Sequence, residues 1–176
     1  GSSTNQSGVS LTDTAAINAT GTAGIDITGN GDNGDSDGVL INSAINSNTG
    51  TVTINTVDDD IQFGATGSLS SVNGTVTIDA DTAGTSADVF MVSGAVINAG
   101  LGLIDVDADV DVTVGSLQTS GNVQLNAIAG EIIDGNAGAT NITANSLTAS
   151  AVTGINLDTT ITTVTSATVS GTGAID

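Results

Sequence analysis

The sequence predicts an all-β fold, a parallel β-helix (β-solenoid) with roughly 20–25 residues per coil. Three observations predict it. Apolar and polar residues alternate with a period of two in several segments, a short motif recurs one coil further along the chain, and the only aromatic residues are two Phe, with no Trp, Tyr or Pro. The alternation is typical of half-buried strands, and the recurrence is typical of stacked repeats. An immunoglobulin-type sandwich would normally bury a large aromatic residue.

The clearest predicted strands have aliphatic residues on one face and Thr, Asp, Asn or Gln on the other. They span residues 51–55, 75–80, 105–114 and 122–126. Turn-forming residues lie between the strands, at 48–50, 73–74, 98–100, 120–121 and 134–136. Asn, Asp, Ser and Gly at these places favour tight turns, and no segment has a helical pattern.

The motif Gly-Thr-Val-Thr-Ile occurs at 50–54 and again at 74–78, which separates Val52 from Val76 by 24 residues. Leu103, Val123 and Ile142 are the expected equivalents further along the chain. We therefore expect a single solenoid segment over residues 1–176, less regular over 1–47 and clearer over 48–176. We also expect it to be part of a longer repetitive chain.

The charge balance narrows the function classes. The chain has 19 Asp and Glu but no Lys, Arg, His or Cys. Without these residue types, the usual general bases, phosphate ligands and thiol nucleophiles are missing. We expect no enzyme, no catalytic residues and no required cofactor. Nucleic acid is excluded as a partner because its phosphates need basic side chains, and no apolar run is long enough for a membrane span.

Residues 30–38 are the best candidate for a metal-binding loop. Asn33, Asp35 and Asp37 alternate with other residues before Gly38, like the first half of an EF-hand loop. Oxygen ligands on a turn suit Ca²⁺, although the twelfth loop position is Ala44 rather than Glu. Bound Ca²⁺ and a plain solvated loop both stay open.

Asp58 and Asp60 are a second candidate, because alternate residues of a strand share a face and an ion could bridge them. The alternative is a charged turn between strands. Asp105, Asp107, Asp109 and Asp111 are expected to form a carboxylate stripe opposite Val106, Ala108, Val110 and Val112. The stripe is either an interface that requires cations or a solubilising outer face that blocks unwanted strand pairing.

Several segments are similar to known repeats. Gly121–Ala127 reads Gly-Asn-Val-Gln-Leu-Asn-Ala and is followed at 130–135 by Gly-Glu-Ile-Ile-Asp-Gly. Together with the Gly-Thr-Val-Thr-Ile units and residues 145–149 and 154–157, this resembles the repeats of filamentous-haemagglutinin-like bacterial surface proteins. The resemblance covers residues 48–176. It implies a right-handed parallel β-helix, exported to the cell exterior, that serves as an adhesin or filament.

We therefore expect a non-enzymatic, extracellular, structural or adhesive solenoid segment that forms a stalk or filament on the cell surface. Its expected partners are neighbouring repeats or copies of itself joined end to end, and also surface glycans or other cells. One alternative is a tandem β-sandwich adhesin module rigidified by Ca²⁺. Another is an ice- or polysaccharide-binding β-helix. The Thr-x-Thr pairs Thr51/Thr53 and Thr75/Thr77 are the basis for the ice-binding alternative, and the paired carboxylates are the basis for polysaccharide recognition.

Overall fold

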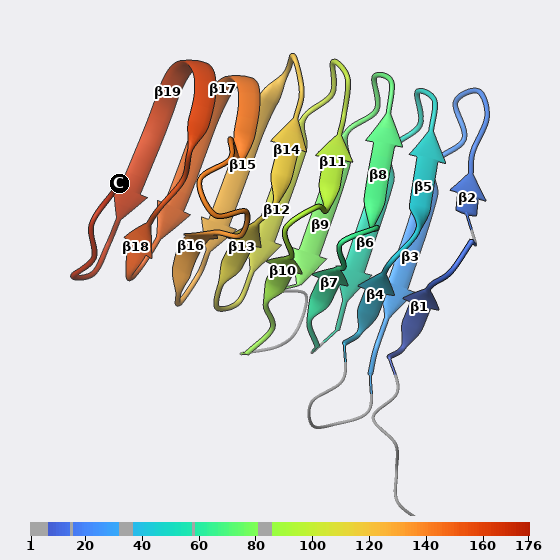
Figure 1. Cartoon of the computed structure of the whole chain (residues 1–176), viewed down its shortest axis with the longest axis horizontal. Helices are drawn as coiled ribbons and strands as arrows, with labels where there is room; N and C mark the ends of the chain where they lie inside the picture. Colours follow the sequence, from blue (N-terminus) through green and yellow to red (C-terminus); the bar gives the residue numbers. More distant parts are fainter. Residues whose placement is uncertain (1–6, 15, 32–36, 58, 81–85) are drawn as a thin grey trace, which may run out of the picture.

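The computed structural model describes residues 7–14, 16–31, 37–57, 59–80 and 86–176. It confirms the predicted fold class, because the strands stack side by side in parallel coils of about 24 residues, with no helix among the described residues (Figure 1). One sheet has seven strands, which are β1 (Val9–Leu11), β4 (Val39–Ile41), β7 (Ile61–Phe63), β10 (Val89–Met91), β13 (Val112–Val114), β16 (Glu131–Asp134) and β18 (Gly154–Ile155).

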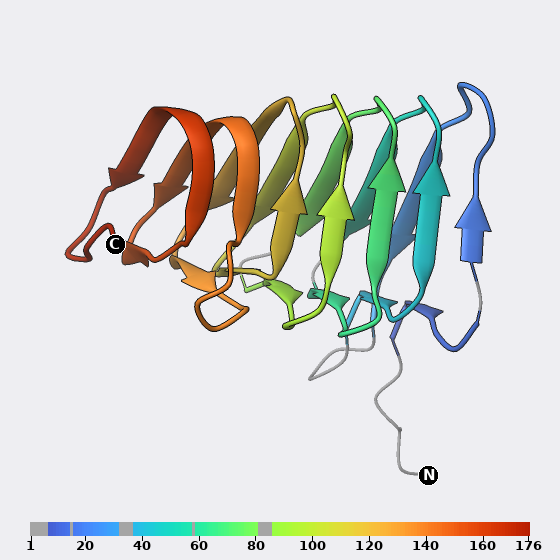
Figure 2. The same cartoon turned by 45° about the horizontal axis from the view of Figure 1, so that its top comes forward.

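The second sheet has twelve strands and folds around the core as two arms. The first arm contains β2 (Ala16–Asn18), β5 (Ala44–Ser47), β8 (Ser68–Ser71), β11 (Val96–Asn98) and β14 (Ser116–Gln118). The second contains β3 (Ile25–Gly29), β6 (Val52–Thr56), β9 (Val76–Ala80), β12 (Ile104–Ala108) and β15 (Asn122–Ala127). The long strand β17 (Ile142–Ala151) pairs with both arms, and β19 (Thr159–Val169) pairs with β17 at the end of the stack (Figure 2).

The recurring Gly-Thr-Val-Thr-Ile motif sets the register of the second arm. Val52 stacks on Val76 and Ile54 on Ile78, so the two copies lie directly one above the other. The sequence separation between ladder partners ranges from 17 residues, between Ile142 and Thr159, to 30 residues, between Val9 and Val39. Chain length therefore varies in the connections while the strands keep their register.

Two of the expected equivalents are wrong. The partner of Val76 is Ile104 rather than Leu103, and the partner of Val123 is Leu147 rather than Ile142. Ile142 stacks on Leu117 in the other arm. The first error is a shift of one residue, since Leu103 directly precedes β12. The second arises because β17 runs through two arms without a break, and spacing alone does not show which half continues which ladder.

The predicted strand over 105–114 is also wrong in extent. It consists of β12, which ends at Ala108, and β13, which starts at Val112 in the other sheet. The chain turns the corner between them, where the N–H of Val110 donates to the carbonyl of Ala87 at 3.1 Å. The partner strand β9 ends at Ala80, so a longer β12 would leave its ladder.

The interior is one contiguous aliphatic cluster that runs through all the coils. Phe63 is its one buried aromatic residue within the described part of the chain, and it stacks between Ile41 and Met91. Every strand pairing of the described residues is parallel, whereas sandwiches of the immunoglobulin type are antiparallel. The tandem-sandwich alternative is therefore wrong.

Candidate functional site

Four carboxylates stack at the corner that precedes the seven-stranded sheet. Asp60, Asp88 and Asp111 directly precede β7, β10 and β13, and Glu131 is the first residue of β16. Because Ile61, Val89, Val112 and Ile132 are successive ladder partners, each carboxylate lies one coil from the next. We call these four residues the acidic ladder. Adjacent parallel strands are about 4.8 Å apart, so its members lie close together.

A chain of hydrogen bonds fixes the acidic ladder. The Oδ1 atom of Asp60 accepts the N–H of Asp88 at 2.8 Å, and the Oδ1 atom of Asp88 accepts the N–H of Asp111 at 2.9 Å. The Oδ1 atom of Asp111 accepts the N–H of Glu131 at 2.7 Å. Each of the three Asp carboxylates thus satisfies a backbone donor of the next coil.

These carboxylates have only other carboxylates as charged neighbours, since the chain has no basic side chain. Burial raises the pKa of Asp88 above its ordinary value, the hydrogen bond from Asp111 opposes this, and the charges of Asp60 and Asp111 raise it further. The acidic ladder therefore carries uncompensated negative charge along the side of the sheet where its strands begin.

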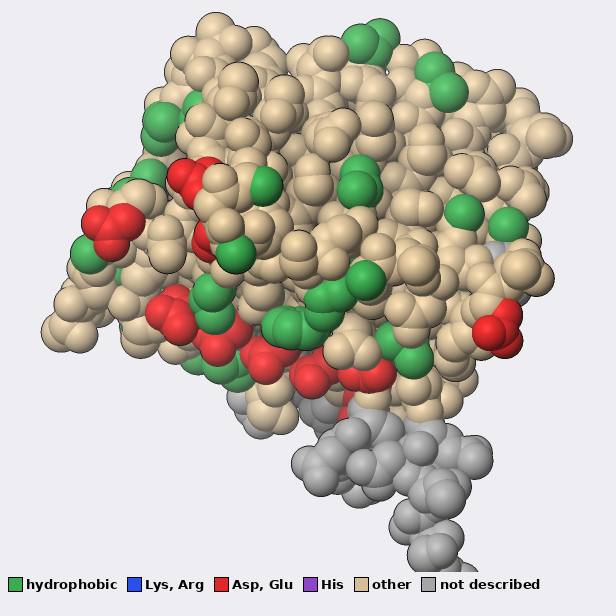
Figure 3. All heavy atoms as spheres, in the orientation of Figure 1, with side chains coloured by type: hydrophobic (Ala, Val, Ile, Leu, Met, Phe, Trp, Pro, Cys, Tyr) green, Lys and Arg blue, Asp and Glu red, His purple; other side chains and the backbone are tan. Residues whose placement is uncertain are grey.

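An apolar row lies beside the acidic ladder on the outer face of the seven-stranded sheet. The middle residues of successive strands stack in one line there, namely Ser10, Leu40, Gln62, Phe90, Thr113 and Ile133. We call Leu40, Phe90 and Ile133 the apolar row. Phe90 is 40% exposed although it is one of two aromatic residues in the chain. Figure 3 shows hydrophobic side chains gathered beside a row of carboxylates on this face.

The structure does not place the predicted stripe of Asp105, Asp107, Asp109 and Asp111 on one surface. Asp105 and Asp107 lie on the outer face of β12, where Asp107 stacks on Asp79 of β9. Asp109 follows the strand and is only 8% exposed, and Asp111 belongs to the acidic ladder. The stripe ends at Ala108 because the alternation of side chains ends where the strand does.

Burial is the main cause that raises the pKa of Asp107, followed by the charge of Asp105; a hydrogen bond from Asn126 lowers it and the charge of Asp79 raises it. Burial also raises the pKa of Asp105, with a further contribution from Asp79. Asp79, Asp105 and Asp107 therefore form a second group of mutually repelling carboxylates, on the twelve-stranded sheet.

The calcium candidates fall partly outside the described residues, where Asn33, Asp35 and Asp58 lie. The structure brings Asp37 and Asp60 together, since burial and then the charge of Asp60 raise the pKa of Asp37. Across the described ranges, no group of three His, Cys, Asp or Glu side chains is arranged to hold a metal ion. One carboxylate oxygen of Asp60 is already bonded to the N–H of Asp88.

The Thr-x-Thr array is short. Thr53 stacks on Thr77, but Asp105 follows Thr77 in the ladder and Gln124 follows Asp105. The uniform threonine surface that the ice-binding alternative needs therefore covers two coils at these positions.

Sequence reasoning missed the structural role of Asn141, which stands out in the sequence only as part of an Asn-Ile-Thr glycosylation motif. Its side chain is fully buried, and its Nδ2 donates to the carbonyl of Val114 at 2.7 Å and to Oδ1 of Asp134 at 3.0 Å. Its Oδ1 accepts the N–H of Asp158 at 2.8 Å. Asn141 thus joins three successive coils at one corner.

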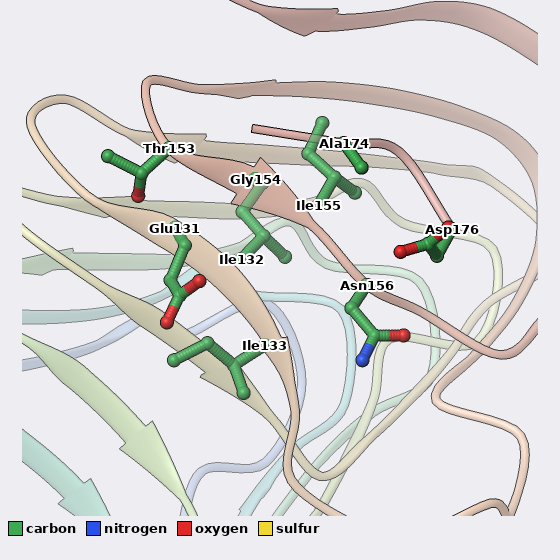
Figure 4. A pocket seen from close by; sticks show the side chains of 9 residues that line it. All are labelled: Glu131, Ile132, Ile133, Thr153, Gly154, Ile155, Asn156, Ala174 and Asp176. Atoms are coloured by element: carbon green, nitrogen blue, oxygen red, sulfur yellow. The ribbon is translucent and has the colours of Figure 1, made fainter. Parts of the chain in front are cut away.

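The C-terminal end of the stack is open. Core layers of the terminal coil are only half-buried at Leu157, Ile161, Ala167 and Val169, and Val164 is 57% exposed. A hollow of about 350 Å³ lies beside β18, where Figure 4 shows the carboxylates of Glu131 and Asp176. Its lining consists of Glu131, Ile132, Ile133, Thr153, Gly154, Ile155, Asn156, Ala174 and Asp176.

The fold defines the chain as a β-solenoid. Comparison with protein-family models, with curated proteins and with solved structures gives no match. Among the described residues there is no helix with the length and apolar character needed to span a bilayer.

Proposed function

We propose that this chain is a non-enzymatic structural segment of an extracellular bacterial stalk or filament, extended end to end by a second copy. The observation that carries the proposal is the edge strand β19. It has eleven residues, pairs with β17 along one edge, and contains no charged side chain in a chain of net charge −19.

Exposed edge strands usually carry charges or are covered, because their free N–H and C=O groups pair with other strands. β19 has the opposite character, since Thr, Ser, Val, Ile and Ala make up its whole length. Its ladder also leaves core side chains half-buried at Ile161, Ala167 and Val169. A further coil would pair the edge and bury these side chains.

A second copy can supply that coil through the opposite end of the stack. β1, β2 and β3 present a three-strand edge, and Val9, Leu11 and Ile17 are likewise only partly buried there. The negative charges on the outer faces of the two copies repel each other. This repulsion is weakest at the end formed by β19, because β19 carries no charge. An extracellular location is supported by the resemblance of the repeats and by the lack of Lys and Arg, which leaves trypsin-like proteases no cleavage site.

Sedimentation velocity and negative-stain electron microscopy over a range of protein concentrations test end-to-end assembly. The matched variants are Val164→Lys, whose residue stacks over buried Leu147, and Thr168→Lys, which stacks over exposed Ser150. Both add the same charge to β19. We expect wild type and Thr168→Lys to form rods that lengthen with concentration, and Val164→Lys to stay monomeric because a buried Lys is costly.

The proposal is overturned if the wild type stays monomeric at the highest concentration, or if the two Lys variants behave alike. EDTA is added in a parallel series. Rods that persist in EDTA support pairing through backbone and apolar layers, whereas rods that dissociate mean that Ca²⁺ joins the copies.

A further inference from the structure

We infer that the outer face of the seven-stranded sheet binds an extended, basic segment of another protein, in which Lys or Arg alternates with apolar residues. The surface consists of the acidic ladder and the apolar row, which run parallel along the rod. It is distinct from the two ends that the proposed assembly uses.

The charge of the face determines the kind of partner. Three of the four carboxylates of the acidic ladder use one oxygen to bind a backbone N–H of the next coil. Structural bonding therefore holds the carboxylates in line but does not neutralise them. With no Lys, Arg or His in the chain, a second copy would bring only more negative charge. A basic segment of a different molecule supplies the countercharge that a second copy lacks.

The apolar row indicates that the partner carries apolar residues as well as basic ones. Phe90 is 40% exposed, and Leu40 and Ile133 are half-buried on the same face. Aromatic and aliphatic side chains at such positions are typical of the centre of a protein interface, where they contribute most of the binding free energy. A purely cationic polymer would leave them in water.

The length of the apolar row matches that of a short extended segment. From Leu40 to Ile133 the row rises by four coils, or about 19 Å at roughly 4.8 Å per coil. About six residues of extended chain cover the same length, at roughly 3.3 Å per residue. Successive side chains of an extended segment point to opposite sides, so basic residues on one side can meet the acidic ladder while apolar residues on the other meet the row.

Binding of two fluorescein-labelled peptides of about eight residues tests the inference, one alternating Lys with Val and the other alternating Lys with Ser. Fluorescence anisotropy at low and high salt gives the Kd of each. We expect the Lys-Val peptide to bind more tightly than the Lys-Ser peptide, and both to weaken with salt because exposed charge pairs are screened.

The variants separate this face from the general acidity of the chain. Asp60→Asn with Asp88→Asn removes two charges but keeps a side-chain oxygen for the corner hydrogen bonds, and it should weaken Lys-Val binding about tenfold. The matched control, Asp105→Asn with Asp107→Asn, removes the same charge from the twelve-stranded sheet and should change the Kd less than about twofold. Phe90→Ser should weaken Lys-Val binding about fivefold and leave Lys-Ser binding unchanged.

Equal losses in the two double variants would mean non-specific attraction to a polyanion and would overturn the inference. No effect of Phe90→Ser would overturn it too, and this arm does not depend on the Asn variants folding. Failure of both peptides to bind would overturn it as well. If Ca²⁺-dependent self-association is then lost in Asp60→Asn with Asp88→Asn, the face belongs to contacts between copies instead. Thermal melts of each variant confirm that the solenoid is intact.

Discussion

Asp107 of β12 lies one coil above Asp79 of β9 in the parallel register, on the outer face of the solenoid. A parallel ladder stacks equivalent positions, so like charges meet wherever the repeat places an acid twice. This chain has no basic residue with which to separate them. Repulsion along the ladders is therefore built into the folded state.

The stability of the solenoid should increase when the pH falls from neutral. The pKa values of Asp37, Asp88, Asp105 and Asp107 are all raised above the ordinary 3.8, chiefly by burial. Between 3.8 and the raised values the folded state binds more protons than the unfolded state, so the free energy of unfolding falls as pH rises through that window. Acidification through the raised pKa values toward 3.8 reverses the loss.

Thermal melts followed by circular dichroism from pH 7 to about 4.5 should show a rising Tm. Asp107→Asn should reduce the slope. Asp134 contributes to the pH dependence of stability with the opposite sign. Hydrogen bonds from Asn141 and then from the N–H of Asn136 are the main causes that lower its pKa, so its contribution to stability is lost as the pH falls below 3.8. A Tm that decreases steadily over the same range would contradict the prediction.

The two Phe residues should differ sharply in their effect on stability. Phe63 is fully buried in the aliphatic core, so Phe63→Ala leaves a cavity and should lower the free energy of unfolding by about 3–5 kcal/mol. Phe90→Ala changes an outward-facing residue and should cost less than about 1 kcal/mol. Urea denaturation of both variants measures the difference, and similar losses would contradict the orientation of β10.

Gly74 should not tolerate Ala. A Cβ atom at Gly74 would collide with the carbonyl oxygen of Gly50 in the coil below, and backbone atoms cannot move aside cheaply. Gly74→Ala should cost about 2–3 kcal/mol. The control is Gly154→Ala, whose nearest contact would be the carbonyl oxygen of Ala174 at an ordinary 3.6 Å. Thermal melts of the two variants should differ, and equal Tm values would contradict the close coil contact.

Asn141→Ala should destabilise the fold by about 2–4 kcal/mol, because the N–H of Asp158 loses its acceptor and the buried carbonyl of Val114 keeps only the N–H of Gly135. Asn141→Asp should be worse above the pKa of the new carboxyl, since it would face Asp134 and a carbonyl oxygen. Asn145→Ala is the control, as this exposed amide reaches Oδ1 of Asn122 only at 3.5 Å. Chemical denaturation at two pH values measures all three, and an Asn141→Asp loss independent of pH would argue against the contact with Asp134.

Much of the fold can be predicted from the sequence, because the alternation of apolar and polar residues along each strand is a local pattern. The alternation of Val52, Ile54, Val76 and Ile78 specifies both the buried face and the stacking, and the structure confirms both. Corners are harder, since Val110 and Asp111 continue the same alternation although the strand has already ended at Ala108. Alternation indicates which side chains face inward, but it does not indicate where the backbone bends.

The candidate surface was less predictable than the fold. Asp60, Asp88, Asp111 and Glu131 are separated by 20 to 28 residues in unequal steps, so only the register of the seven-stranded sheet aligns them. Phe90 likewise stands alone in the sequence, and its alignment with Leu40 and Ile133 depends on the same register. Asn141 needed the three-dimensional corner before its role could be recognised.

The exact stacking of the two Gly-Thr-Val-Thr-Ile copies has a further consequence. A unit that begins and ends at the same point of the cross-section can be duplicated or deleted without disturbing the layers on either side. Each such event changes the length of the rod by a fixed increment of about 4.8 Å. Gene duplication can thus change the length of the rod in discrete steps, one coil at a time.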